Sequence, residues 1–377
     1  MSEKKKFGLK SILTMDINDL FKKKVGSSAK QSKVKETKSM MKPVVSFDFG
    51  SESIKVVEGR YFNGQLKVTN YFTVPTQGVL EDGRIVNEKL LIKNLETALK
   101  EHKVKAKYAI CTLNSTQIIN RELFVPVVEE DELDTVVRFE IQQFLPINLS
   151  DYLIQYVILD QVEVNGEPRL KLNVVTFPEK LAATYYKVLK EVGLKPHALD
   201  VTYNSLGKLA NYSKLLNEMT DAKGAVAFVD MGAQSIDLNI FTNENVQFTR
   251  LIKSGGMTIN ERLNQLPDMS IKSAASLEQA DLNSDEVISR ILRLSVDEMM
   301  YELERVLQFY RNKSIGNKID HVFILGGCSN INSLETYMSE KLSIPTSQLK
   351  RLNNVDFSDS SIQVHEYANA IGAMIRL

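Results

Sequence analysis

The chain has 377 residues, with 47 basic and 47 acidic side chains, 43% hydrophobic residues, two cysteines and no tryptophan. This length suits roughly two or three domains, and the composition excludes a wholly disordered, collagen-like or disulfide-stapled protein. No apolar run is long enough to span a bilayer, and the first lysines precede no unbroken apolar core, so we expect a cytoplasmic protein without a cleaved signal peptide.

The zero net charge is the sum of two opposite parts. Residues 1–42 contain twelve lysines, no arginine and four acids, whereas residues 43–377 contain 35 basic and 43 acidic residues. Apolar residues recur at helical spacing over 9–21 between lysine clusters, and residues 25–40 have the composition of a flexible linker. We predict a basic flexible tail. Either residues 9–21 form a short amphipathic helix and residues 1–24 contact a membrane surface or a partner, or the periodicity is chance in a disordered segment.

The first folded segment begins after Pro43 with alternating β-branched and aromatic residues. Glycine-bearing turns at Phe49-Gly50 and Asn63-Gly64 interrupt this alternation, which predicts three consecutive strands. A helix over 87–101 and a strand over 107–114 follow. We expect residues 43–120, together with a helix within 201–220, to form a first lobe.

Residues 121–200 differ in pattern and predict a helix, two strands and a second helix. An acid-rich stretch after Pro126 suits the positive end of a helix, Asn165-Gly166 predicts a turn between the strands, and Gly193 ends the second helix. This range is expected to be a small inserted α+β subdomain.

Residues 221–377 predict a second lobe that opens with another strand–turn–strand over 225–241. A mainly helical part covers 257–313, and the apolar stripe of its longest helix, near 287–311, is assigned to core packing. A buried strand, a double-glycine turn and a helix follow over 321–342.

Three glycine-bearing turns carry the candidate chemistry, and the first spans residues 48–55. Glycine permits positive φ and close backbone approach, so the N–H groups of such a turn can surround an anion. An aspartate at the strand end can hold a hydrated divalent cation, and a lysine can reach a phosphate oxygen. The candidate residues are Asp48, Gly50, Ser51, Ser53 and Lys55.

The second turn repeats this plan, and the third lies between a buried strand and a helix, where glycines leave room for a flat ring or a sugar. Each motif alone is more often a plain turn or a packing device. Their order, however, is typical of two related lobes that close on a nucleotide. The candidate residues here are Asp230, Gly232, Gln234 and Ser235, then Gly326, Gly327 and Cys328.

These three turns resemble the two phosphate loops and the adenosine motif of the actin-like ATPase superfamily. Within it, FDFGSESIKVVE, VDMGAQSIDLNIF, GGCSNINSLETYMSEKLSIP and the insertion at 127–152 resemble the PilM family of type IV pilus assembly proteins, which is related to the cell-division protein FtsA. The resemblance covers 44–377. It implies a two-lobed actin-like (ribonuclease H-like) α/β fold with an inserted subdomain. It also implies ATP and Mg²⁺ as ligands, with Asp48 and Asp230 holding the metal through water and Gly256 on the adenosine side.

The sequence departs from the superfamily pattern at several positions. Ala233 replaces an acidic residue, Asn260 replaces a threonine and is expected to cap the following helix, and Ala275 and Glu278 replace a Glu and a Lys that touch the adenosine. These changes predict weaker nucleotide contacts. Because no hydrolytic base can be assigned by spacing, we expect slow or no ATPase activity. The four histidines show no ligand-like pairing and are interpreted as surface or core residues.

The resemblance implies a cytoplasmic scaffold at the inner face of the cytoplasmic membrane. It would bind the cytoplasmic amino-terminal peptide of an inner-membrane PilN-type protein, other pilus components and copies of itself in a ring, and no nucleic acid. The expected peptide groove is walled by Phe139, Gln143, Phe144 and Tyr152, unless these residues simply pack the subdomain core. The alternatives are an FtsA-like membrane-tethered filament protein of cell division, or an actin-fold small-molecule kinase or ATPase.

Overall fold

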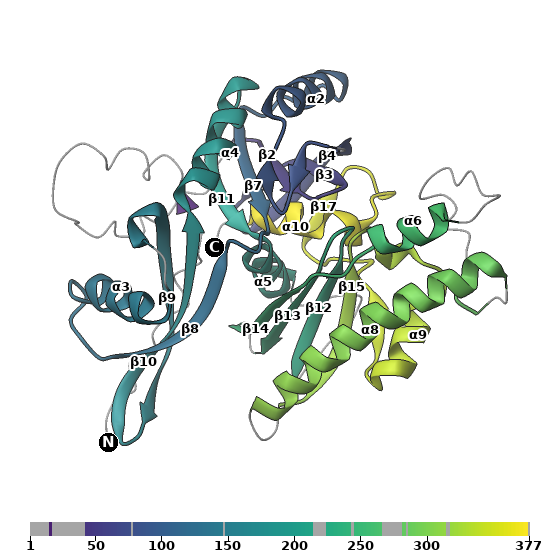
Figure 1. Ribbon diagram of the computed structural model, residues 1–377. Coiled ribbons are helices and arrows are strands. Elements are labelled where there is room, and N and C mark those ends of the chain that lie inside the picture. Colours follow the sequence, from purple (N-terminus) through teal and green to yellow (C-terminus); the bar gives the residue numbers. More distant parts are fainter. Residues whose placement is uncertain are drawn as a thin grey trace.

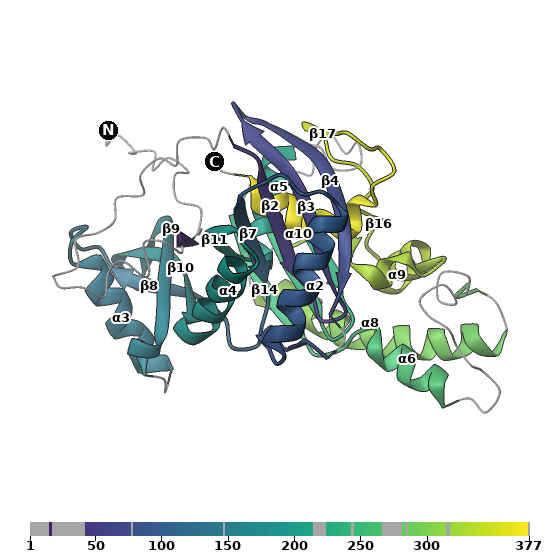
Figure 2. The ribbon, with the colours of Figure 1, turned by 90° about the horizontal axis from the view of Figure 1, so that it is seen from above.

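The computed structural model describes residues 15–16, 42–76, 78–145, 148–213, 224–242, 245–265, 281–283, 286–313 and 317–375. Two lobes, each built on a central β-sheet, pack against each other, and a small third unit extends from the first lobe (Figure 1). The view from above shows the same arrangement, with the third unit at one side and the helices of the second lobe at the other (Figure 2).

The first lobe contains a seven-stranded sheet whose strand order is β1-β11-β7-β2-β3-β4-β17. The strands are β1 (Met15–Asp16), β2 (Val44–Phe49), β3 (Ser53–Phe62), β4 (Gln65–Pro75), β7 (Tyr108–Leu113), β11 (Lys195–Val201) and β17 (Val355–Phe357). A two-stranded hairpin of β5 (Leu80–Glu81) and β6 (Arg84–Ile85) lies beside it. The three strands expected after Pro43 are therefore confirmed.

Helices cover both faces of this sheet. On one face lie α2 (Glu88–Glu101) and α4 (Glu179–Glu191), and between the two lobes lie α5 (Thr202–Ser213) and α10 (Val364–Met374). The helix expected over 87–101 is confirmed: Asn87 caps it by accepting a hydrogen bond from the N–H of Leu90, and Leu91 and Leu95 are buried. The helices α5 and α10 approach so closely that a β-carbon on Gly372 would overlap the carbonyl oxygen of Ser205. This contact fixes the core that the lobes share.

The second lobe contains a five-stranded sheet in the order β14-β13-β12-β15-β16. Its strands are β12 (Ala225–Met231), β13 (Ile236–Thr242), β14 (Asn245–Ile252), β15 (Ile319–Leu325) and β16 (Thr346–Gln348). Its helices are α6 (Met257–Asn264), α8 (Val287–Lys313), the 3₁₀ turn η2 (Gly327–Asn330) and α9 (Leu334–Leu342). The stripe on α8 is buried in the core of this lobe, as predicted, from Met299 to Tyr310.

The third unit, called the module below, is a three-stranded antiparallel sheet with one helix on it. It consists of β8 (Ile119–Pro126), α3 (Leu133–Phe144), η1 (Leu149–Asp151), β9 (Tyr152–Val164) and β10 (Glu167–Pro178). Asn165 and Gly166 both have positive φ, 54° and 82°, as a tight hairpin turn requires. The range 121–200 is divided, because α4 packs in the core of the first lobe and β11 is a strand of its sheet.

The amino-terminal segment differs from one expectation. Within the amphipathic helix expected over 9–21, Met15–Asp16 instead form β1, an antiparallel strand on β11. The other residues of 1–41 lie outside the described residues, as do Ala275 and Glu278. Within the part that the structure describes, no helix is both long enough and apolar enough to cross a membrane.

Candidate functional site

The first predicted turn joins β2 and β3. Asp48 lies directly opposite Lys55 in this antiparallel ladder. Gly50 is needed for close packing, because a β-carbon there would lie 2.7 Å from the carbonyl oxygen of Ser53. The hydroxyl of Thr76 donates to the carbonyl oxygen of Ser51 at 2.7 Å, which holds the turn in place.

The second turn joins β12 and β13, and Asp230 lies directly opposite Asp237. Its backbone is fixed by the following segment: the N–H of Gly256 donates to the carbonyl of Gly232 at 3.1 Å, and the N–H of Met257 donates to that of Ala233 at 2.8 Å. The predicted adenosine-side turn at Gly256 therefore rests on the second phosphate turn.

The third turn follows β15. Gly326 has a φ of +80°, and a β-carbon there would overlap the carboxylate of Asp230, so both conformation and space require glycine. A β-carbon on Gly327 would meet no described atom within 4 Å, so its backbone faces open space. The thiol of Cys328 donates to the carbonyl of Gly232 at 3.4 Å, and burial raises its pKa to about 11, so it is a structural thiol and not a reactive one.

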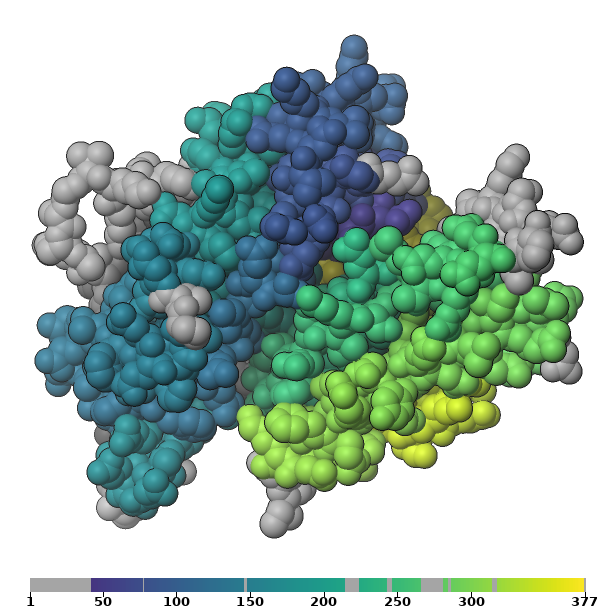
Figure 3. Space-filling view, viewed as in Figure 1, coloured from purple at the N-terminus to yellow at the C-terminus, as the bar shows by residue number. Residues whose placement is uncertain are grey.

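These three turns line one cleft of about 950 Å³ between the lobes. In the space-filling view, the purple atoms of the first lobe lie next to the green atoms of the second lobe, where the cleft separates the lobes (Figure 3). All thirteen residues predicted to bind nucleotide line this cleft: Asp48, Gly50, Ser51, Ser53, Lys55, Asp230, Gly232, Gln234, Ser235, Gly256, Gly326, Gly327 and Cys328. Sequence segments that lie far apart therefore form a single site.

The carboxylates of Asp48, Asp230 and Asp237 lie deep in the cleft, and their negative charges are only partly compensated by neighbouring groups. Burial, followed by the charge of Asp230, raises the pKa of Asp48 from 3.8 to about 7, and the same two causes raise that of Asp237 to about 8. Burial also raises the pKa of Asp230. Asn369 of α10 donates to both Asp48 and Asp230, at 3.2 and 2.8 Å, and Asn114 donates to Asp237 at 2.5 Å. A cation would relieve the remaining repulsion.

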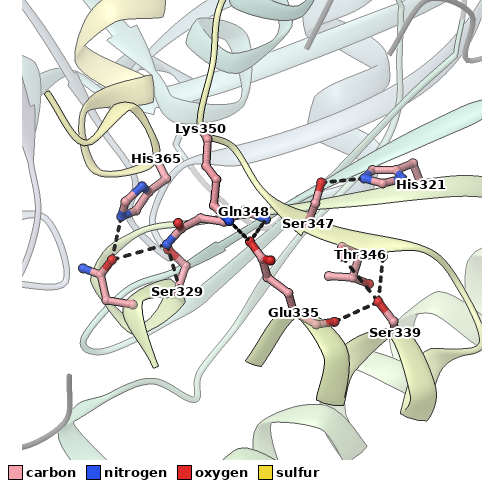
Figure 4. A network of polar contacts seen from close by, with 10 residues as sticks. His321, Ser329, Glu335, Ser339, Thr346, Ser347, Gln348, Lys350 and His365 are labelled. Atoms are coloured by element: carbon pink, nitrogen blue, oxygen red, sulfur yellow. Dashed lines mark hydrogen bonds and ion pairs between the residues drawn. The ribbon is translucent and has the colours of Figure 1, made fainter. Parts of the chain in front are cut away.

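Lys55 is ion-paired across the cleft wall with Glu366 of α10, at 3.0 Å. The other oxygen of Glu366 accepts from Asn330 at 2.8 Å, and the oxygen of Asn330 lies 2.7 Å from a ring nitrogen of His365. Figure 4 shows the surroundings of His365, where the side-chain amide of Gln348 donates to the carbonyl oxygen of Ser329 in the third turn at 2.9 Å. His365, interpreted as a surface or core residue, is buried in α10, and it also lines the cleft.

Several cleft residues were missed in the sequence. Asp237 could have been identified as a cleft residue from its spacing, because it lies seven residues after Asp230, just as Lys55 lies seven residues after Asp48. Glu366 and Asn369 had no such signal, because they lie in α10, a helix in which most residues, Asn369 included, are buried. Asn260 was interpreted wrongly: it lies inside α6, whose N-cap is Gly256, and faces the cleft instead of capping the helix.

The deciding comparison is with family models. The model of the family described as "Type IV pilus assembly protein PilM" matches residues 46–376. The chain belongs to this family. Its members are the pilus assembly proteins that the motif resemblance indicated, and the match spans both lobes and the module.

Relatives and solved structures agree with the PilM family fold. The chain is 22% identical over 301 residues to cell division protein FtsA of Streptococcus pneumoniae serotype 2, covering 73% of this chain and 64% of that protein. A PilM–PilN type IV pilus biogenesis complex superposes with a TM-score of 0.75 at 20% identity, covering 88% of this chain and 98% of that one. Ethanolamine utilization protein EutJ of Carboxydothermus hydrogenoformans gives 0.51 at 14%, covering 88% and 89%. The predicted two-lobed actin-like fold is confirmed.

The residues predicted to wall a peptide groove all lie on the module of this PilM family member. Phe139 and Phe144 of α3 are 61% and 55% exposed, so they do not pack the module core. Gln143 is also exposed, and Tyr152, at the start of β9, is half-buried. The guanidinium of Arg121 on β8 lies 5.9 Å from the ring centre of Phe144. The aromatic side chains are thus available for contact.

Proposed function

We propose that this protein is a nucleotide-binding scaffold of type IV pilus assembly that holds the cytoplasmic peptide of a PilN-type inner-membrane protein. The observation that carries the nucleotide part is the convergence of thirteen motif residues on one cleft with an excess of buried carboxylates. Membership of the PilM family supports the assembly role.

The residues of the cleft fit Mg-ATP. Asp48 and Asp230 would hold the metal through water, and the N–H groups of the first two turns with Lys55 would bind phosphates. The open backbone at Gly327 leaves space for the nucleoside beside Cys328. The metal would supply positive charge where burial now raises the pKa of Asp48 and Asp230.

A thermal-unfolding titration tests nucleotide binding. A ligand that binds only the folded state stabilises it by RT ln(1 + [L]/Kd), so the melting temperature should rise with Mg-ATP concentration. Adenosine with Mg²⁺ is the matched control without phosphates. No shift at millimolar Mg-ATP would rule out this part of the proposal.

The domain organisation that goes with this function has four parts. They are a basic tail over 1–42, a first lobe over 43–120 and 201–220, a module within 121–200, and a second lobe over 221–377 whose helical part covers 257–313. Within the last range, β17 belongs to the first sheet and α10 packs on that sheet, which argues for assigning both to the first lobe. The packing of α4 and β11 with the first sheet argues for ending the module near Pro178. Limited proteolysis should cut between these units before it cuts within them.

The partner part rests on the module. A solved relative is a complex of PilM with PilN, and the exposed Phe139 and Phe144 offer apolar anchors for a short peptide. Fluorescence anisotropy with a labelled PilN-type amino-terminal peptide measures binding. Phe139→Ala with Phe144→Ala should weaken it at least about tenfold, the range for losing buried aromatic anchors. Leu294→Ala, equally exposed on α8 of the second lobe, is the control.

Catalysis is expected to be slow or absent, because no group in the described cleft is assigned to activate water. Phosphate release from Mg-ATP above about one turnover per minute would favour the kinase or ATPase alternative. A ring of copies and contacts with other pilus components belong to the same proposal and are tested by sedimentation with the partner peptide.

The second candidate is an FtsA-like filament protein at the membrane, which the 22% identity to FtsA supports. Pelleting of polymers that depends on Mg-ATP and is indifferent to PilN-type peptide would favour it. In either case we propose a cytoplasmic protein peripheral to the inner membrane. Deleting residues 1–40 should then reduce co-sedimentation with anionic vesicles, because the deletion removes most of the lysines of the basic tail.

A further inference from the structure

The lysine of the first phosphate turn is already neutralised by the protein itself. Lys55 and Glu366 meet at 3.0 Å, and each side chain is only 18% exposed. Both line the cleft, and no sequence motif connects them, because they are 311 residues apart. A phosphate group that binds the ammonium of Lys55 must therefore compete with the carboxylate of Glu366, which is already ion-paired with it.

The ion pair is built so that Glu366 can release Lys55 without losing all its partners. Glu366 lies in the first turn of α10, where the helix dipole favours negative charge. Its second oxygen accepts from Asn330 at 2.8 Å. Burial alone would raise the pKa of Glu366, but the charge and hydrogen bond of Lys55 with the Asn330 bond hold it below its ordinary value. Glu366 is thus a charged carboxylate at neutral pH.

Lys55 is equally suited to exchange partners. Its ammonium is a compact point charge on a flexible stem, with three donors that need no fixed planar geometry. It also lies 5.9 Å from the centre of the Tyr367 ring, a contact that does not depend on Glu366. A phosphate oxygen can take the place of one carboxylate oxygen without rebuilding the strand that carries Lys55.

We propose that Glu366 is an internal counter-ion that competes with ligand phosphate for Lys55 and so sets the affinity of the cleft for phosphate-bearing ligands. This inference rests on the proposed nucleotide function, and it identifies Glu366 as a residue that lowers the affinity for the nucleotide. The same carboxylate contacts Asn330 of the third turn, and the N–H of Gly326 donates to the carbonyl of His365 at 3.1 Å. Release of Lys55 is therefore coupled to the turn beside the nucleoside space.

The test uses Glu366→Gln, which removes the charge and keeps an acceptor for Asn330. Isothermal titration calorimetry of the full chain with Mg-ATP and with pyrophosphate should give binding about three- to tenfold tighter than wild type, as expected when a partly buried ion pair no longer competes. Binding of adenosine, which has no phosphate, should be unchanged. Glu366→Ala serves as a second variant if the amide variant does not fold.

Lys55→Gln supplies the matched background. In that variant phosphate ligands should bind more weakly, and adding Glu366→Gln should change their affinity by less than about twofold. A gain that persists without Lys55, or that appears equally for adenosine, would contradict competition at Lys55.

The two proposals fail in different ways. If wild type binds Mg-ATP and Glu366→Gln binds it equally or more weakly, the counter-ion role is overturned and nucleotide binding stands. If wild type binds neither Mg-ATP nor pyrophosphate at millimolar concentration, both are overturned.

Discussion

The two hairpin turns between β2 and β3 and between β12 and β13 share one plan and differ at one equivalent position. In the first, Asp48 is paired across the ladder with Lys55, whereas in the second, Asp230 is paired with Asp237. The first hairpin therefore includes a basic residue, although its ammonium is ion-paired with Glu366. The second places two carboxylates opposite each other, which is unfavourable without further partners. Asn114, which follows β7, and Asn369 of α10 supply hydrogen bonds to these carboxylates, and Asn369 also donates to Asp48 of the first hairpin.

The second hairpin has a carboxylate where the first has Lys55, so its charge must be balanced entirely by groups outside the hairpin. Its carboxylates are stabilised by the first lobe, by the third turn packed on it and, as we propose, by a bound cation. Substitutions at the residues that surround each hairpin should therefore affect stability and ligand binding differently for the two hairpins.

The largest effect is expected from Gly326→Ala. Alanine is strained at a φ of +80°, and its β-carbon would overlap Asp230, so unfolding should become easier by about 2–4 kcal/mol. Urea unfolding monitored by circular dichroism measures this. Gly327→Ala is the matched control, since no described atom lies within 4 Å of its β-carbon position, and its stability should be near that of wild type. Equal losses in both would show that close packing on Asp230 is not the cause.

Asp48→Ala should abolish the rise in melting temperature with Mg-ATP, because it removes a carboxylate that we propose holds the metal. Thermal scans with and without ligand measure this. Asp356→Ala, on the far edge strand β17, should keep the wild-type shift. A full ligand shift in Asp48→Ala would mean that the first hairpin contributes no metal contact.

The next largest effect is expected in the pH dependence of the free energy of unfolding, which should differ when the carboxylate pair of the second hairpin is changed. The pKa of Asp237 is raised from 3.8 to about 8, so its stabilising contribution is fully present below 3.8 and is lost as pH rises from there to about 8. Asp237→Asn should therefore stabilise the ligand-free protein at pH 9 by on the order of 1–3 kcal/mol and change it little at pH 4. Urea unfolding with chelator present measures both.

The control for this comparison is Glu163→Gln, an exposed carboxylate on β9 of the module. Its pH profile should run parallel to that of wild type. If Asp237→Asn also runs parallel, the carboxylate pair of the second hairpin is not a source of the pH dependence.

The smallest effect is expected from Cys328→Ala. The thiol contributes a single weak hydrogen bond to Gly232, and its high pKa keeps it un-ionised. The Mg-ATP shift should stay within about one degree of wild type, since about 1 kcal/mol or less is at stake. Loss of the shift would assign Cys328 a direct part in binding.

Much of the site could be predicted because its turns are local. In each of the three turns an aspartate or a buried strand is followed by glycine. Gly50 and Gly232 are explained by a contact within a few residues, and Gly326 by its positive φ. The hairpin at Asn165-Gly166 and the helix capped by Asn87 were predicted for the same reason. A turn or a helix cap depends on only a few consecutive residues, so it can be recognised from a short stretch of sequence.

The errors lie where distant segments meet. Met15–Asp16 joins the sheet edge at β11, although its surroundings have helical spacing, because strand pairing is decided by a partner far along the chain. Likewise β11 and α4 pack with the first lobe, although they follow the module directly in sequence.

The family, the two-lobed plan and the residues of the three turns can all be predicted from the amino-acid sequence. The partners of the charges in those turns become visible only in the folded chain: Asn369 lies between two aspartates, Glu366 pairs with Lys55, and Asn114 donates to Asp237. The physical reason is that a turn needs only its own few residues to form. Neutralising a buried charge, in contrast, needs a partner within about 3 Å, and the fold supplies it from more than a hundred residues away.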